Sequence, residues 1–273
     1  MHSFRTRLSC LENVKNSDSI GNCAGLVGNL IVTYLTHGNA EIAICLLPGR
    51  SPVVVFLPGY MSDMGGSKAL ALEAWAAARG QACLRLDYSG CGASGGDFAD
   101  GSISRWTADV AAVLDHLGIA HPILVGSSMG GWIALRLAAA RPVAALLGIA
   151  AAPDFPDWGL QLSAADHAGL AQHGFIERPC AYDSAPYRYT RTFLDDAAAS
   201  RVLTGSIAVD APVRLLHGQA DPDVPWQLSV DVAVRLRSAD VQVMLVKDGD
   251  HRLSRPQDLT LLTATLDRLL ESL

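Results

Sequence analysis

Ser128 is the residue whose setting most clearly suggests chemistry, because it is the central serine of a G-x-S-x-G pattern over residues 126–130. An apolar run at residues 122–126 precedes it, and an alanine- and leucine-rich run at residues 129–140 follows. This pattern predicts a buried strand that turns sharply into a helix at Ser128. Glycine suits both flanks because strand and helix crowd each other there. The hydroxyl then projects beside the N–H groups of the helix N-terminus, so Ser128 is the candidate nucleophile.

A nucleophilic serine needs a base to accept its proton and an acid to orient that base. In parallel α/β sheets such groups gather at the carboxyl ends of the strands. Asp221 follows an apolar run that ends at Leu216, and His251 follows one that ends at Val246. The chain order Ser128, Asp221, His251 is the order expected for a strand–turn–helix nucleophile. We therefore predict His251 as the base and Asp221 as the acid.

Three neighbouring residues compete for these roles. Asp223 lies two positions after Asp221 and is an alternative acid. Asp250 adjoins His251, where a carboxylate more readily forms a turn than reaches the imidazole. His217 ends a strand, and we expect it to be structural.

The oxyanion of an acyl-transfer intermediate needs backbone donors. The N–H of Met129, which directly follows the nucleophile, is the first candidate. The second should come from the loop after the apolar strand at residues 53–57. Tyr60 is the best candidate there, with Met61 as the alternative.

The rest of the chain alternates apolar strands with amphipathic helices. Residues 29–36 and 40–47 predict an antiparallel hairpin, and Ser104 is predicted to cap a helix over residues 105–117. Further strands are predicted at residues 53–57, 82–86, 122–126, 143–149, 213–216 and 241–246, with helices at 67–79, 129–140, 227–236 and 256–273. Such alternation predicts an α/β fold with a mostly parallel twisted sheet and helices on both faces.

These elements make one domain over residues 29–273. Residues 153–205 break the alternation, with no convincing strand, and we expect this insertion to cover the site as a lid or cap. The alternative is a surface excursion with its own small core. Residues 1–28 are predicted to be an N-terminal extension of uncertain order.

The composition excludes several classes of protein. The chain has 273 residues and a formal net charge of −6, and no basic run with interleaved aromatic residues suggests nucleic acid. Its longest apolar stretches are too short to span a membrane. The six cysteines show no C-x-x-C pair, which favours reduced thiols in a cytoplasmic protein. No metal-ligand spacing occurs.

Four motifs carry a resemblance to a known family. They are Leu57-Pro58-Gly59-Tyr60-Met61-Ser62, Asp87-Tyr88-Ser89-Gly90, residues 125–132 (VGSSMGGW) and residues 248–254 (DGDHRLS). With them the chain resembles the α/β-hydrolase superfamily over nearly all of residues 29–273. It looks most like the branch of the mitochondrial acyl-protein thioesterase that also hydrolyses acyl-glucuronides, which has many bacterial relatives. Pro58-Gly59 stands where the superfamily often has His-Gly, as in this branch.

The resemblance implies ester or thioester hydrolysis by Ser128, Asp221 and His251, without a metal or an organic cofactor. We therefore predict a serine hydrolase that forms an acyl-enzyme from a small-molecule ester, an acyl thioester or an acylated protein. Peptidase or perhydrolase activity on the same residues is one alternative. A non-catalytic binding protein that keeps the fold is another.

Overall fold

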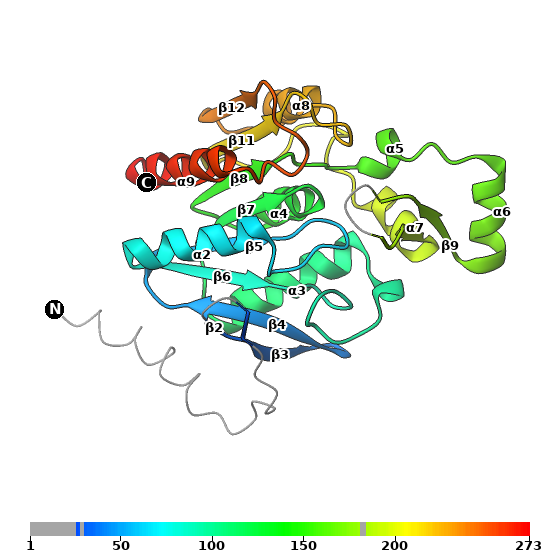
Figure 1. Ribbon diagram of the computed structural model, residues 1–273, viewed down its shortest axis with the longest axis horizontal. Coiled ribbons are helices and arrows are strands. Elements are labelled where there is room, and N and C mark those ends of the chain that lie inside the picture. The colour runs from blue at the N-terminus through cyan, green and yellow to red at the C-terminus, as the bar shows by residue number, and fades with distance from the viewer. Residues whose placement is uncertain (1–25, 28–29, 181–183) are drawn as a thin grey trace.

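The computed structural model describes residues 26–27, 30–180 and 184–273 (Figure 1). The extension predicted over residues 1–28 lies outside this part of the chain, apart from β1 (Leu26–Val27), which pairs with β2 (Leu30–Ile31). No described helix has both the length and the apolar character needed to cross a bilayer.

An eight-stranded sheet forms the centre of the molecule. The six strands from β12 to β6 are parallel, whereas β4 runs antiparallel to both β6 and β3. The order across the sheet is β12 (Val241–Val246), β11 (Val213–Gly218), β8 (Ala145–Ile149), β7 (Ile123–Ser127), β5 (Arg50–Leu57), β6 (Gln81–Leu86), β4 (Ala40–Leu47) and β3 (Thr33–His37).

Helices cover both faces of this sheet. One face packs against α2 (Ser67–Arg79) and α9 (Pro256–Glu271), with Leu72, Trp75 and Leu266 in the core. The other face packs against α3 (Ile103–His116), α4 (Met129–Ala140) and α8 (Gln227–Arg235), with both Trp106 and Trp132 fully buried. The predicted fold class, a mostly parallel sheet between two helical layers, is thereby confirmed.

The start of α3 differs from the prediction. Ser102, and not Ser104, caps this helix, because its hydroxyl accepts a hydrogen bond from the N–H of Arg105 at 3.3 Å. Ser104 lies inside the first turn, where its N–H and hydroxyl both donate to the carboxylate of Asp196. The side chain that the local sequence predicts as the cap is therefore hydrogen-bonded instead to a residue 92 positions away.

The segment at residues 153–205 lies beyond one end of the sheet (Figure 1). It contains α5 (Phe155–Gly159), α6 (Ala164–His173), β9 (Phe175–Arg178), β10 (Tyr187–Thr190) and α7 (Arg191–Ala199). The antiparallel pair β9–β10, in which Tyr189 pairs with Ile176, was not predicted from the sequence. Each strand has only four residues, too few for a clear period of two.

The two ends of this insertion meet at one buried carboxylate. Asp154 is 3% exposed, and it accepts hydrogen bonds from the N–H of Val202 at 3.0 Å and of Leu203 at 2.8 Å. Nearby, the side chains of Trp132 and Arg136 donate to the carbonyl of Ser200 at 3.1 and 2.8 Å. The insertion is therefore closed at its base and fastened to α4.

Candidate active site

Ser128 occupies the turn between β7 and α4, with φ 53° and ψ −121°. A non-glycine residue in this region is strained, typically by about 1–3 kcal/mol, and the surrounding packing must hold it there. The N–H of Ser128 donates to the carbonyl of Ile149 at 2.9 Å. A Cβ on Gly126 would lie 2.3 Å from the carbonyl oxygen of Gly130, and one on Gly130 would lie 2.1 Å from that of Leu57. The two glycines are thus required by the close approach of strand and helix.

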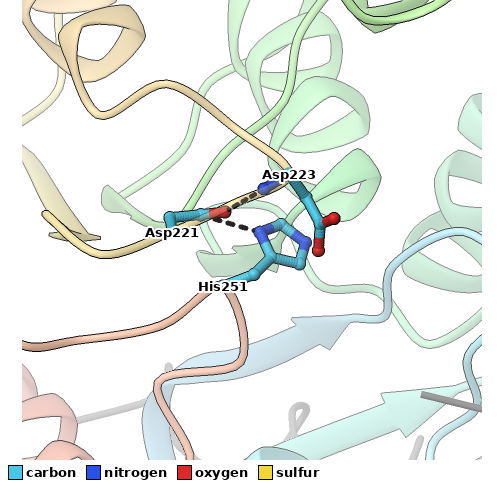
Figure 2. Close-up of side chains that lie close together, drawn as sticks. All are labelled: Asp221, Asp223 and His251. Atoms are coloured by element: carbon cyan, nitrogen blue, oxygen red, sulfur yellow. Dashed lines mark hydrogen bonds and ion pairs between the residues drawn. The ribbon is translucent and has the colours of Figure 1, made fainter. Parts of the chain in front are cut away.

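His251 bridges Ser128 and Asp221. Its Nε2 lies 3.1 Å from Oγ of Ser128, and its Nδ1 lies 2.8 Å from Oδ2 of Asp221. Because a carboxylate only accepts, Nδ1 carries the proton, which leaves Nε2 free to accept the serine hydroxyl. The structure brings the three predicted residues together from the turn after β7 and from the loops that follow β11 and β12. Figure 2 shows two of them, Asp221 and His251, with Asp223 beside them.

The carboxylate of Asp221 is fully buried and receives four donors. The N–H groups of Asp223 and Val224 bond to Oδ1 at 2.8 Å each, and His217 lies 3.2 Å from Oδ2, the oxygen that His251 also contacts. Burial alone would raise the pKa of Asp221. The hydrogen bonds from His217, His251 and the backbone outweigh it and hold this pKa well below its usual value.

The rival residues have other positions. The carboxylate of Asp223 is exposed, while that residue's N–H donates to Asp221. Oδ1 of Asp250 accepts from the N–H of Leu253 at 2.9 Å, as expected for a turn former. Asp221, Asp223 and His251 are also the described side chains close enough to ligate one cation, with ligand atoms within 4.8 Å of one another.

His217 has a larger part in the site than the sequence suggests. Its ring is fully buried, with Nδ1 2.7 Å from the hydroxyl of Ser229 and Nε2 3.0 Å from the carbonyl of Val224. Since Val224 and Asp221 both offer acceptors, Nε2 must be the protonated nitrogen. The only sequence signal was its position four residues before Asp221, at the end of a strand.

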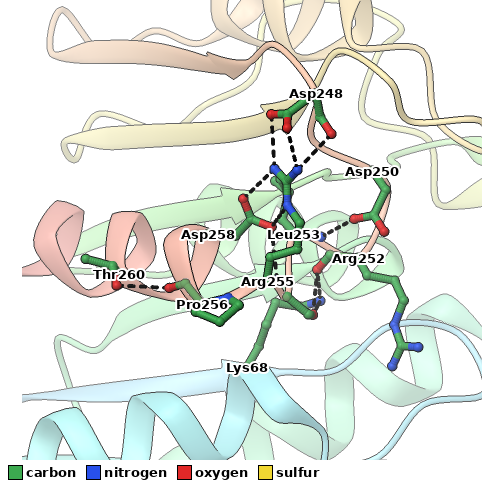
Figure 3. A network of polar contacts seen from close by, with 10 residues as sticks. Lys68, Asp248, Asp250, Arg252, Leu253, Arg255, Pro256, Asp258 and Thr260 are labelled. Atoms are coloured by element: carbon green, nitrogen blue, oxygen red, sulfur yellow. Dashed lines mark hydrogen bonds and ion pairs between the residues drawn. The ribbon is translucent and has the colours of Figure 1, made fainter.

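The loop that carries His251 is held by a lysine side chain from α2. Leu253 has φ 42°, and Nζ of Lys68, at the start of α2, donates to the carbonyl of Arg252 at 2.5 Å (Figure 3). Burial, with a smaller effect from Arg252, lowers the pKa of Lys68 to about 8. Lys68 thereby connects the first turn of α2 to the residue after His251, although 184 positions separate Lys68 from Arg252.

Arg255 fastens the end of the same loop. Its guanidinium donates to Asp258 in the first turn of α9 and to Asp248 at the end of β12, at 2.8 Å in each case (Figure 3). Both carboxyl groups have a lowered pKa, chiefly because of their hydrogen bonds to Arg255. The guanidinium of Arg255 therefore ties the loop after β12 to the start of α9.

The candidate oxyanion donors lie beside Ser128. A Cβ added to Gly59 would be 3.3 Å from Cβ of Ser128, so the loop at Gly59 and Tyr60 directly adjoins Ser128. Met129 is the first residue of α4. In the described parts of the chain, neither the N–H of Tyr60 nor that of Met129 has a hydrogen-bond acceptor. Met61, the alternative donor, has φ 52° and an exposed side chain.

Residues 58–64 form the loop that contains Tyr60, and we call it the oxyanion loop. Both of its ends are fixed by residues that directly follow β6. The hydroxyl of Tyr88 donates to the carbonyl of Pro58 at 3.0 Å, and the N–H of Met64 donates to Oδ1 of Asp87 at 2.7 Å. Burial raises the pKa of Asp87 to about 6, although backbone N–H groups oppose the shift. The loop is therefore tied to a buried carboxyl group whose pKa lies above that of an ordinary aspartate.

A pocket of about 660 Å³ opens at Ser128 and His251. Its apolar wall includes Tyr60 from the oxyanion loop, together with Phe155, Trp158, Leu160, Tyr187 and Tyr189 from the insertion. The remaining wall is more polar and includes Asp63, Lys68, Asp223, Arg252 and Ser254. The insertion therefore supplies much of the surface that a bound apolar group would contact.

Comparison with known proteins bears out the resemblance. Residues 54–269 match the alpha/beta hydrolase family. The human protein named palmitoyl-protein thioesterase ABHD10, mitochondrial, is 41% identical over 241 residues, which span 85% of this chain and 78% of the human protein.

Two solved structures have the same fold with similar sequences. A protein from Agrobacterium vitis superposes with a TM-score of 0.83 at 42% identity, covering 87% of this chain and 97% of its own. Mouse alpha/beta hydrolase domain-containing protein 10 gives a TM-score of 0.82 at 39% identity, covering 88% and 98%.

The comparisons contradict the predicted cytoplasmic location. Five relatives, all 40–42% identical to this chain, are named as mitochondrial proteins. The prediction rested on the cysteines, and the four described ones, Cys45, Cys83, Cys91 and Cys180, carry thiols rather than disulfides. Free thiols argue against an oxidising compartment but do not distinguish one reducing compartment from another.

The family match covers most of the chain, and the sequence relatives are similar over more than two thirds of their own length. The pocket beside a strained serine is consistent with that relationship. The chain belongs to the alpha/beta hydrolase family and is a hydrolase.

Proposed function

We propose that the protein is a serine hydrolase that cleaves a carboxylic ester or an acyl thioester through an acyl-enzyme intermediate. The observation that carries the proposal is the position of His251, 3.1 Å from Oγ of Ser128 and 2.8 Å from the carboxylate of Asp221. This is the separation at which a base can take the proton of a nucleophile.

In the first step Oγ of Ser128 attacks the carbonyl carbon while Nε2 of His251 takes the hydroxyl proton. The ionised Asp221 stabilises the imidazolium that forms. The oxyanion receives hydrogen bonds from the N–H groups of Met129 and Tyr60. His251 then protonates the leaving oxygen or sulfur. Water, activated by the same imidazole, hydrolyses the acyl-serine in a second round.

We further propose an acyl thioester, on a small molecule or on a protein, as the preferred substrate. The relatives that support this choice are named palmitoyl-protein thioesterases. The apolar wall formed by Tyr60, Phe155, Trp158 and Leu160 offers a place for an alkyl chain. Burial of each methylene is worth about 0.8 kcal/mol, so a longer chain gains affinity while it remains inside the wall.

The insertion at residues 153–205 acts in this proposal as a cap on the hydrolase domain at residues 29–273. Its support is the pocket, whose apolar wall comes largely from that segment. The closed base at Asp154 lets the segment behave as one unit. Differences in the cap would then alter acyl-chain preference without altering the bond-breaking residues.

The test uses Ser128→Ala beside Ser206→Ala, which removes an exposed hydroxyl that does not line the pocket. Hydrolysis of a short nitrophenyl ester should fall by more than about 1,000-fold in the first variant and stay at the wild-type rate in the second. A fluorophosphonate probe should label the wild type and Ser206→Ala only. Turnover by Ser128→Ala at the wild-type rate would refute the proposal.

Substrate class is tested separately. Matched oxygen esters and thioesters with acyl chains of two to sixteen carbons should show a rise in kcat/KM with length and a preference for the thioester. A flat response to chain length would contradict the role given to the apolar wall while leaving the serine mechanism intact.

A further inference from the structure

Tyr60 contacts two separate parts of the molecule. Its backbone follows Gly59, which packs against Ser128. Its hydroxyl donates a hydrogen bond to the backbone carbonyl of Arg188, 128 residues further along the chain in β10. One residue therefore links the loop beside the nucleophile to the insertion.

The ring of Tyr60 is held mainly by the same insertion. It stacks on Tyr189 with a centroid separation of 5.1 Å and an interplanar angle of 16°. Phe193 and Phe155 lie at 5.0 and 5.9 Å, and Trp106 of α3 lies at 6.0 Å. Aromatic pairs at these separations add to the stability that burial alone provides. The insertion therefore supplies most of the rings that surround Tyr60, and Phe98 and Trp106 supply the others.

The rest of the oxyanion loop has different supports. Its ends, at Pro58 and Met64, are tied to Tyr88 and Asp87, which directly follow β6. Between these ends, the N–H of Ser62 donates a hydrogen bond to the carbonyl of Gly59 within the loop itself. Among the described residues, the hydroxyl of Tyr60 makes the one hydrogen bond that connects the middle of the loop to another element.

We propose that the hydrogen bond from the Tyr60 hydroxyl to Arg188 positions the Tyr60 N–H for the oxyanion, so that the seated insertion completes the oxyanion hole. The inference rests on the proposed function, in which that N–H is a catalytic donor. The hydroxyl is a positioning group, because it acts only through the backbone of its own residue. A donor displaced by a fraction of an ångström loses much of its value in the transition state.

The test is Tyr60→Phe, which keeps the ring and the N–H and removes only the tie to β10. We expect kcat for a nitrophenyl ester to fall about tenfold while KM changes by less than about twofold, because the lost interaction operates in the transition state. A trifluoromethyl ketone, which forms a tetrahedral adduct with the nucleophilic serine, should bind about tenfold more weakly. Tyr34→Phe, on β3 and not among the residues that line the pocket, is the matched control.

A purely structural role would lower the melting temperature and leave the affinity of the adduct unchanged for the folded enzyme, which would overturn the inference. Wild-type kcat in Tyr60→Phe, or a change in KM alone, would overturn it too. Fluorophosphonate labelling of the wild type separates this failure from that of the proposed function. A labelled wild type with an unaffected Tyr60→Phe refutes only the role of the hydroxyl.

Discussion

Nε2 of the fully buried His217 lies 3.2 Å from Oδ2 of Asp221, the same oxygen that Nδ1 of His251 contacts, so two histidines converge on one carboxylate. His217 is in turn fixed by Ser229 and by the carbonyl of Val224. The acid of the site therefore belongs to a buried polar network, in which each member depends on the others.

Replacing His217 with Phe should weaken the enzyme at acidic pH. The hydrogen bond from His217 lowers the pKa of Asp221, so its loss raises that pKa and more of the carboxyl is protonated at a given pH. The acidic limb of the kcat/KM profile should therefore move to higher pH. His116→Phe on the surface is the control, and an unchanged acidic limb in His217→Phe would show that His217 only fills space.

Asp221→Asn should lower kcat by about 10,000-fold, because an amide cannot hold the imidazolium or the required tautomer. Asp223→Asn should cost less than about tenfold, since Asp223 uses its N–H and not its carboxylate to contact Asp221. Steady-state kinetics of both variants on one nitrophenyl ester decides between them. Equal losses would contradict the assignment of the acid.

Lys68→Met should lower kcat about tenfold with little change in KM. The methionine keeps much of the packing of the stem but cannot donate to the carbonyl of Arg252, so the loop that carries His251 gains freedom. Lys247→Met, at an exposed lysine, is the matched control. A loss of substrate affinity without a loss of kcat would instead indicate that Lys68 contacts the substrate.

Asp87→Asn should alter how stability depends on pH. In the folded protein the pKa of Asp87 is about 6, above its usual value of 3.8, so the native state binds the proton more tightly than the unfolded chain. This carboxyl therefore adds stability as pH falls below about 6. Between pH 7 and pH 4.5 the gain amounts to about 2 kcal/mol.

Asp87→Asn lacks that gain. Relative to the wild type, the variant should thus lose about 2 kcal/mol between pH 7 and pH 4.5, measured by urea unfolding at both values. Asp63→Asn, at an exposed carboxyl on the same loop, controls for charge. A difference between Asp87→Asn and wild type that does not depend on pH would contradict the shifted pKa.

The central sheet and the three residues at its edge could be predicted because their signals are local. A buried parallel strand is a continuous apolar run, and Gly126 and Gly130 mark the turn at Ser128 within five residues. The ends of neighbouring parallel strands must lie close together. The sequence therefore predicts that the loops containing Asp221 and His251 lie beside Ser128.

The contacts that hold the loops around the site have no such local signal in the sequence. Lys68 and Arg252 lie 184 positions apart, and Tyr60 and Arg188 lie 128 apart. Neither pair forms a pattern along the chain, because tertiary packing alone brings them together. The same holds for Ser104, whose propensity to cap a helix is overridden by Asp196.

The hydrogen bonds that the amides of Val202 and Leu203 donate to Asp154 bring the two ends of the long insertion to one point. The chain therefore leaves the hydrolase domain and returns to it at nearly the same place. The residues between these two ends can therefore change in number and in sequence without moving the points at which the insertion joins the hydrolase domain. New specificities become accessible to the scaffold without rebuilding the machinery that breaks the bond.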